Sequence, residues 1–83
     1  MQIYRARFGG SLCEIAGESL CSNPGRVVAW ALLVKSDGRL EPILDGRGRM
    51  LRTHASSLDE AIDSMRRLLV TLLGDEARGE TSS

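Results

Sequence analysis

The chain has 83 residues, of which 42% are hydrophobic and 27% are charged, and its eleven basic residues balance its eleven acidic ones. This length suits one domain with a small core, and the zero net charge argues against strong nonspecific binding to nucleic acid. Two cysteines are too few for a disulfide framework. The longest apolar run, Val27 to Val34, is too short to span a bilayer, and residues 1–20 lack a signal-peptide pattern. The composition therefore predicts a reduced, cytoplasmic protein without membrane contact.

In the segment QIYRARF, residues 2–8, one side would carry Tyr4, Ala6 and Phe8 and the other Ile3, Arg5 and Arg7. This alternation is typical of a half-buried strand. Gly9 and Gly10 follow it and can supply the positive φ angles of a two-residue hairpin turn. Folding back around this turn gives the pairs Phe8 with Ser11, Ala6 with Cys13, Arg5 with Glu14 and Tyr4 with Ile15. The apolar members then share one face, and Arg5 meets Glu14 as a cross-strand ion pair on the other.

Residues 11–21 also fit a second structure. SLCE is a capping box, and Leu12, Ile15, Ala16 and Leu20 recur at helical spacing. Because Gly17 would weaken such a helix by roughly 1 kcal/mol relative to alanine, we favour the hairpin without excluding the helix. The stretch GESLCSNPG, residues 17–25, is then expected to be a loop that ends in the Asn23-Pro24-Gly25 turn signal.

The segment RVVAWALLVK, residues 26–35, is apolar on both faces and predicts a central strand, with a helix on one side and another cover on the other. Turn signals at Asp37-Gly38 and at residues 45–48 divide the chain that follows. Between them RLEPIL predicts a strand that Pro42 places at an edge, and RMLRTH, residues 49–54, predicts a further strand.

The helix expected at residues 57–73 begins with a capping box of Ser57 and Glu60, and Gly74 ends it. Its apolar stripe comprises Leu58, Ala61, Ile62, Met65, Leu68, Leu69, Leu72 and Leu73. We expect residues 1–74 to form one α+β domain, a small antiparallel sheet of roughly three to five strands with this long C-terminal helix on one face. Residues 75–83 are expected to be a disordered polar tail.

The segment ASSLDEAIDSMRRLL, following a sheet, resembles the helix of the small sheet-plus-helix antitoxins. The proline-glycine strand motif of those proteins is missing here, so no functional residue is transferred from them.

The sequence predicts a noncatalytic protein-interaction module that self-associates, most simply as a homodimer. Its apolar side chains exceed what one helix and one small sheet can bury, and an uncovered apolar face would exceed what monomers usually expose. The free face of the sheet or the leucine-rich helix end would form the contact. The residues expected there are Trp30, Leu68, Val70, Leu72 and Leu73.

An alternative hypothesis is a nucleic-acid-binding regulator that uses its Gly-Arg turns. Its phosphate contacts would come from Arg39, Arg47, Arg49 and Arg52. Acidic residues lie between these arginines, which favours solvated corners of a sheet instead.

Signals of catalysis are weak, so we expect no enzyme activity, no cofactor and no metal site. His54 lies near Ser57, but Ser57 is better explained as a helix cap. Cys13 and Cys21 could form a bond on oxidation, although buried, unreactive thiols are the simpler interpretation. A small-ligand site would need a pocket that two subunits build between them.

Overall fold

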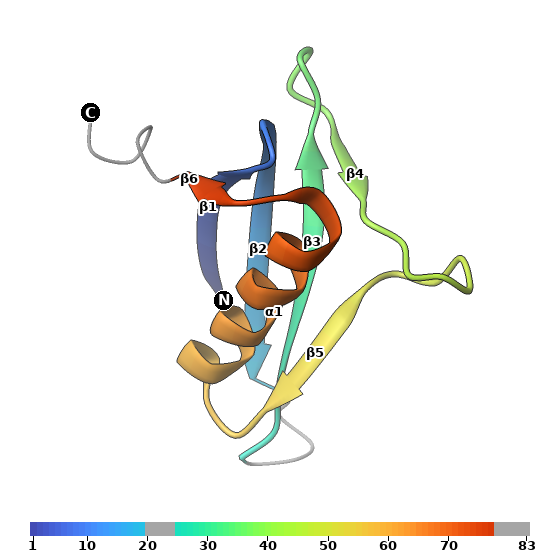
Figure 1. Cartoon of the computed structure of the whole chain (residues 1–83). Helices are drawn as coiled ribbons and strands as arrows, with labels where there is room; N and C mark the ends of the chain where they lie inside the picture. Colours follow the sequence, from blue (N-terminus) through green and yellow to red (C-terminus); the bar gives the residue numbers. More distant parts are fainter. Residues whose placement is uncertain (20–24, 78–83) are drawn as a thin grey trace.

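The computed structural model describes residues 1–19 and 25–77. Its elements in chain order are β1 (Gln2–Phe8), β2 (Ser11–Ser19), β3 (Val27–Val34), β4 (Leu40–Pro42), β5 (Arg52–Ala55), α1 (Leu58–Leu73) and β6 (Glu76–Ala77). The strands form one antiparallel sheet in the order β4-β3-β2-β1-β6, and β5 pairs with β3 on the same edge as β4 (Figure 1). The predicted α+β class, a small sheet with one long helix on one face, is confirmed.

The N-terminal hairpin has the predicted register. Phe8 pairs with Ser11, Ala6 with Cys13, Arg5 with Glu14 and Tyr4 with Ile15 around the Gly9-Gly10 turn. Residues 11–19 are therefore strand and not helix.

The loop predicted for residues 17–25 is wrong at its start, since Gly17 to Ser19 continue β2 and pair with β3. A side chain at Gly17 would come within 3.1 Å of Leu58 and 3.3 Å of Ile62, so the glycine makes room for α1 on the strand. Residues 20–24, including Cys21, lie outside the described part of the chain.

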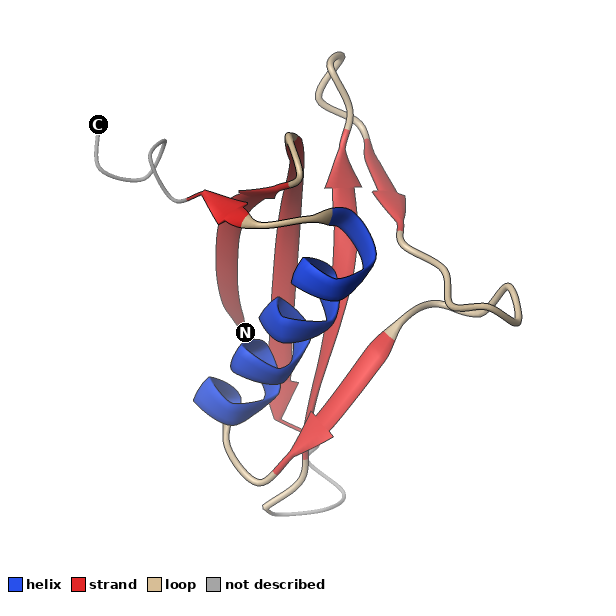
Figure 2. Ribbon diagram, in the orientation of Figure 1, coloured by secondary structure: helices blue, strands red, loops and turns tan. Residues whose placement is uncertain are grey.

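The helix begins and ends where the capping signals predict. The Ser57 hydroxyl accepts a hydrogen bond from the Glu60 amide at 3.2 Å, and the Gly74 amide donates to the Val70 carbonyl at 3.1 Å. Figure 2 shows α1 lying across one face of the sheet, where it packs on β1, β2, β3 and β5. The Thr53 hydroxyl of β5 donates to the Ala61 carbonyl at 2.8 Å, which ties the helix to this edge.

The core lies between α1 and the sheet. Its largest fully buried side chains are Phe8, Cys13, Ile15, Met65 and Leu69. From β3 the core takes Val27, Ala29 and Ala31, whose small side chains let the helix approach the sheet closely. Leu68 and Leu72 belong to the predicted apolar stripe, yet both are exposed, so the stripe is only partly buried.

The sixth strand, β6, lies inside the segment expected to be a disordered tail. Its two residues pair with Arg7 and Phe8 of β1. Glu76 accepts hydrogen bonds from the Arg66 guanidinium and from the Tyr4 hydroxyl. Long-range contacts therefore hold a segment that carries no strand pattern of its own. Residues 78–83 lie outside the described part of the chain.

Pro42 lies in β4 at the edge of the sheet, as predicted, opposite Leu32. The further strand predicted for residues 49–54 is shorter than expected, because β5 begins at Arg52 and Met50 forms only an isolated bridge with Leu44. No helix within the described ranges is long and apolar enough to cross a membrane.

Candidate functional site

The sheet face opposite α1 carries no helix in the described part of the chain. Side chains alternate between the two faces of a strand, and Ala29 and Ala31 of β3 point to the helix. The other face, called the open face below, is thus formed by Ile3, Arg5, Arg7, Leu12, Glu14, Ala16, Glu18, Val28, Trp30, Leu32, Val34, Leu40, Pro42, Arg52 and His54. Figures 1 and 2 show no helix on this side.

Trp30 lies near the middle of the open face. It stands opposite Ala16 of β2 on one side and Arg52 of β5 on the other, and Ile3 of β1 stands opposite Ala16 in turn. The Ala16 side chain is buried and the Trp30 indole is half-buried, whereas Ile3 is 56% exposed. The large indole therefore covers a small neighbour, while its own outer surface remains accessible.

The apolar surface continues toward β4. Leu32 stands opposite Pro42, and Val34 stands opposite Leu40, which is 47% exposed. Leu44 follows the buried Ile43, so its side chain is directed to the open side as well, where it is 54% exposed. Apolar side chains from four adjacent strands thus lie around Trp30 on the open face, although Ala16 and Val28 among them are buried.

The ion pair predicted in the hairpin lies within this face. Nε and Nη2 of Arg5 each approach Oε1 of Glu14 to 2.8 Å. The Glu14 side chain is only 9% exposed and that of Arg5 is 52% exposed. Because the two charges neutralise each other, the pair adds little net field to the open face.

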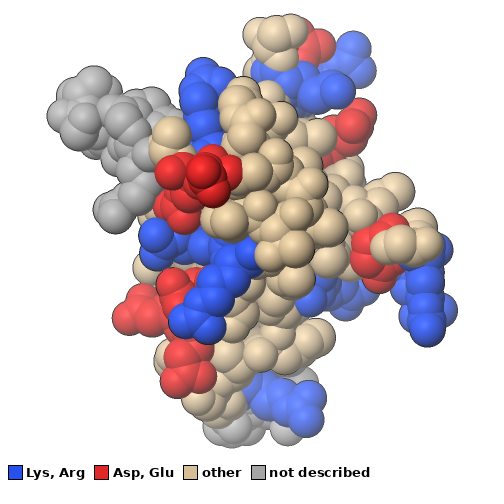
Figure 3. All heavy atoms as spheres, in the orientation of Figure 1, with Lys and Arg blue, Asp and Glu red and all other residues tan. Residues whose placement is uncertain are grey.

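The residues predicted for self-association do not form one surface. Trp30 lies on the open face, whereas the other four lie on α1, on the far side of the sheet. Leu68 and Leu72 are exposed and lie one helical turn apart, and Leu73 is half-buried against the core. Val70 is also exposed, but it lies about 200° around the helix axis from Leu68, on nearly the opposite side. Figure 3, a view from the helix side, shows uncharged surface over the C-terminal half of α1.

The arginines of the nucleic-acid hypothesis are also dispersed. Arg39 lies in the β3–β4 turn and pairs with Asp37, Nε to Oδ2, at 3.0 Å. Arg47 and Arg49 lie in the turn between β4 and β5, which projects in another direction in Figure 1. Arg52 lies on the open face opposite Trp30. The fold thus places them at three locations with acidic residues between, and no single basic surface results.

The turn at residues 45–49 is organised by a carboxylate. Oδ1 of Asp45 accepts hydrogen bonds from the amides of Arg47 at 2.8 Å and Arg49 at 3.0 Å. These backbone hydrogen bonds lower the pKa of Asp45, first that from Arg49 and then that from Arg47. The guanidinium charge of Arg49 contributes less.

We expect carbon-detected NMR titration to place the pKa of Asp45 below the ordinary aspartate value of about 3.9. Because the folded pKa is lowered, the carboxylate stabilises the turn above the unfolded pKa, and this contribution is lost as pH falls through the folded pKa. The amide resonances of Arg47 and Arg49 should move with the same midpoint. This role would be contradicted if Asp45 titrated with the ordinary aspartate pKa, or if the amide resonances of Arg47 and Arg49 moved with a different midpoint.

The residues with catalytic potential are not assembled into a site. His54 is exposed on the open face opposite Val28, and Ser57 caps the helix. Cys13 is a buried free thiol whose pKa is raised by burial, which disfavours the reactive thiolate. Its possible bond with Cys21 involves a residue outside the described ranges. No group of three His, Cys, Asp or Glu suited to a metal ion occurs within residues 1–19 and 25–77.

The chain matches no protein-family model, no curated protein and no solved structure.

Proposed function

We propose that the protein is a small noncatalytic interaction module that self-associates as a homodimer through the open face. The observation that supports this most strongly is the apolar patch around Trp30, to which four adjacent strands contribute. The helix covers only the other face, and the N-terminal hairpin lies beside β3 within the same sheet. Because neither the helix nor the hairpin covers the open face, a second chain is the cover that we propose for it.

A second copy of the chain suits this surface chemically. A two-fold interface brings the same patch of both copies together, so a broad apolar surface is its own complement. Sheets pack face to face about 10 Å apart through interdigitating apolar side chains. The Arg5–Glu14 pair is neutral as a unit, so it brings no unbalanced charge into such an interface. Each of the remaining charged residues of the open face stands opposite an apolar residue of the neighbouring strand. Arg7 pairs with Leu12, Glu18 with Val28 and Arg52 with Trp30.

Two charge substitutions separate the open face from the helix end. Leu40→Glu places a carboxylate on the open face, and Leu72→Glu places one on α1; the two leucines are 47% and 55% exposed, so neither change should unfold the chain. We expect light scattering after size exclusion at micromolar concentration to give twice the 9.0 kDa chain mass for the unmodified protein and for Leu72→Glu. Leu40→Glu should give the single chain mass, because the dimer would bury its new charge.

Three results would contradict the proposal. The unmodified chain could be a monomer at every concentration, Leu40→Glu could leave the dimer intact, or Leu72→Glu alone could dissociate it. The last outcome would assign the contact to the leucine-rich helix end. Binding of the arginine turns to nucleic acid would show separately as a gel shift that weakens steeply with salt.

A further inference from the structure

The outer edge of β1 is paired over only part of its length. β1 spans Gln2–Phe8, and β6 pairs with it only at Arg7 and Phe8. Among residues 1–19 and 25–77, the stretch from Gln2 to Ala6 has β2 on one side and no strand on the other. This stretch is called the free edge below.

The hairpin register determines which backbone groups point out of the free edge. The Gly9 amide donates to the Asp75 carbonyl at 3.0 Å, and Arg7 pairs with Ala77. Outward hydrogen-bonding groups recur at every second residue of an antiparallel strand, so those of Ile3 and Arg5 continue the series. The free edge therefore offers two amides and two carbonyls to an incoming strand.

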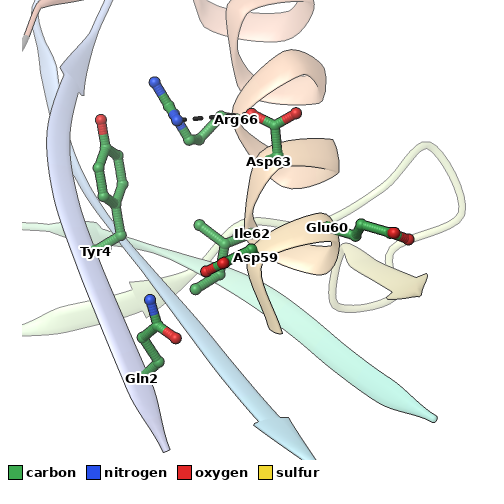
Figure 4. A pocket seen from close by; sticks show the side chains of 7 residues that line it. All are labelled: Gln2, Tyr4, Asp59, Glu60, Ile62, Asp63 and Arg66. Carbon is green, nitrogen blue, oxygen red and sulfur yellow. Dashed lines mark ion pairs between the residues drawn. The ribbon is translucent and has the colours of Figure 1, made fainter. Parts of the chain in front are cut away.

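A hollow of about 400 Å³ lies beside the free edge, between β1 and α1 (Figure 4). Gln2 and Tyr4 extend into it from β1, and Asp59, Ile62 and Arg66 extend from α1. A strand added to β1 would direct alternate side chains to this side of the sheet. The residue opposite Gln2 or Tyr4 would enter the hollow, and the residue opposite Ile3 would lie on the open face.

The charges around the hollow favour a cationic side chain. The Arg66 guanidinium is already occupied, since its Nε lies 3.1 Å from Oε1 of Glu76 and its Nη1 lies 3.6 Å from Oδ1 of Asp63. It also stacks over the Tyr4 ring, 4.8 Å from the centroid. Asp59, in contrast, has no ion-pair partner within the described ranges, and its carboxylate points toward β1 in Figure 4.

We propose that the free edge and this hollow bind an extended peptide segment of another protein by strand addition. A Lys or Arg of that segment would enter the hollow beside Asp59, and an adjacent apolar residue would lie against Ile3. Backbone hydrogen bonds to Ile3 and Arg5 would supply affinity, and the hollow would select the basic side chain. The site shares Ile3 with the open face, whereas the hollow lies on the α1 side of the sheet, so the basic side chain would bind away from the proposed dimer contact.

Two matched peptides test the site by NMR titration of the labelled full-length chain. They are acetyl-Ser-Val-Lys-Val-Ser-amide and its counterpart with Glu in place of Lys. The Lys peptide should shift the amide resonances of Ile3 and Arg5 and slow their hydrogen exchange. It should bind about tenfold more tightly than the Glu peptide, because attraction to Asp59 becomes repulsion.

Variants of the protein separate the backbone contribution from the charge. Ile3→Pro removes an outward amide but no bond to β2, so it should abolish binding, while Ile3→Val should preserve it. Asp59→Asn should weaken binding of the Lys peptide about threefold, and it should not weaken binding of the Glu peptide. Leu40→Glu, designed to separate the proposed dimer, changes neither the β1 backbone nor the hollow, so this variant should still bind the Lys peptide more tightly than the Glu peptide.

The site is refuted if neither peptide perturbs Ile3 and Arg5, if both bind equally, or if Ile3→Pro binds like Ile3→Val. A chain that ends at Ala77 gives a further decisive comparison. If it binds the Lys peptide and the full-length chain does not, residues 78–83 and not another protein occupy the edge.

Discussion

Gly9→Ala is expected to lower the free energy of unfolding by about 3 kcal/mol, combining a left-handed backbone with a steric clash. Gly9 has a φ of 59°, and a Cβ built there would lie 1.9 Å from the Leu73 carbonyl oxygen and 2.7 Å from its carbon. Both are backbone atoms at the end of α1, so no side chain can turn aside. The hairpin and the helix would have to separate, which would also strain the hydrogen bond from the Gly9 amide to Asp75.

Gly10→Ala is the matched control in the same turn. Gly10 has a φ of 88°, but a Cβ there meets no atom within 4 Å. Gly10→Ala should therefore lower the free energy of unfolding only by the cost of a left-handed backbone at alanine, about 1–2 kcal/mol. Urea unfolding followed by circular dichroism measures both variants. Equal destabilisation by the two substitutions would show that the close approach of Gly9 to the helix end does not limit stability.

Leu69→Ala is expected to destabilise the chain by about 3 kcal/mol, since Leu69 is fully buried in the core between α1 and the sheet. A chain of this size has a total stability of about 4–12 kcal/mol, so the substitution removes a large share of it. Truncation leaves a cavity in the buried cluster that also contains Phe8, Ile15 and Met65. A partly unfolded population at room temperature would agree with this expectation.

Leu72→Ala removes the same atoms from a leucine three residues away on α1. Leu72 is 55% exposed, and its loss should cost less than about 1 kcal/mol. Thermal and urea unfolding of the two variants should therefore differ clearly. A cost at Leu72 as large as that at Leu69 would mean that the C-terminal leucines are buried in solution, which would favour the helix end as the interface.

Local signals predicted the hairpin and the helix well. The Gly9-Gly10 turn set a register in which Arg5 meets Glu14, and the capping box of Ser57 and Glu60 located the start of α1. Both depend on residues close in sequence, where turn and cap chemistry act directly.

Tertiary contacts account for the elements that local patterns missed. Gly17 looks like a strand breaker, yet it continues β2 because Leu58 and Ile62 of α1 pack over it. β6 has no hydrophobic pattern, and its Glu76 is held by Arg66 and by Tyr4, which is 72 residues away in sequence. No pattern within a short window reports such partners.

The candidate surface was predicted only in part for the same reason. Both sides of β3 are apolar, so the sequence does not say which side faces α1. Steric fit decides this, since Ala29 and Ala31 admit the helix and Trp30 is left on the open face. The helical stripe pointed to Leu68 and Leu72, but these two side chains remain 37% and 55% exposed.

The most direct test of self-association through the open face uses Trp30, the single tryptophan of the chain, as its reporter. Its fluorescence is measured while the protein is diluted from high micromolar to nanomolar concentration. The proposed dimer predicts emission that shifts to longer wavelength on dilution, as the indole becomes hydrated, with Leu40→Glu in the shifted state throughout. Emission that stays constant across the series, with a mass of 9.0 kDa at every concentration, would contradict it.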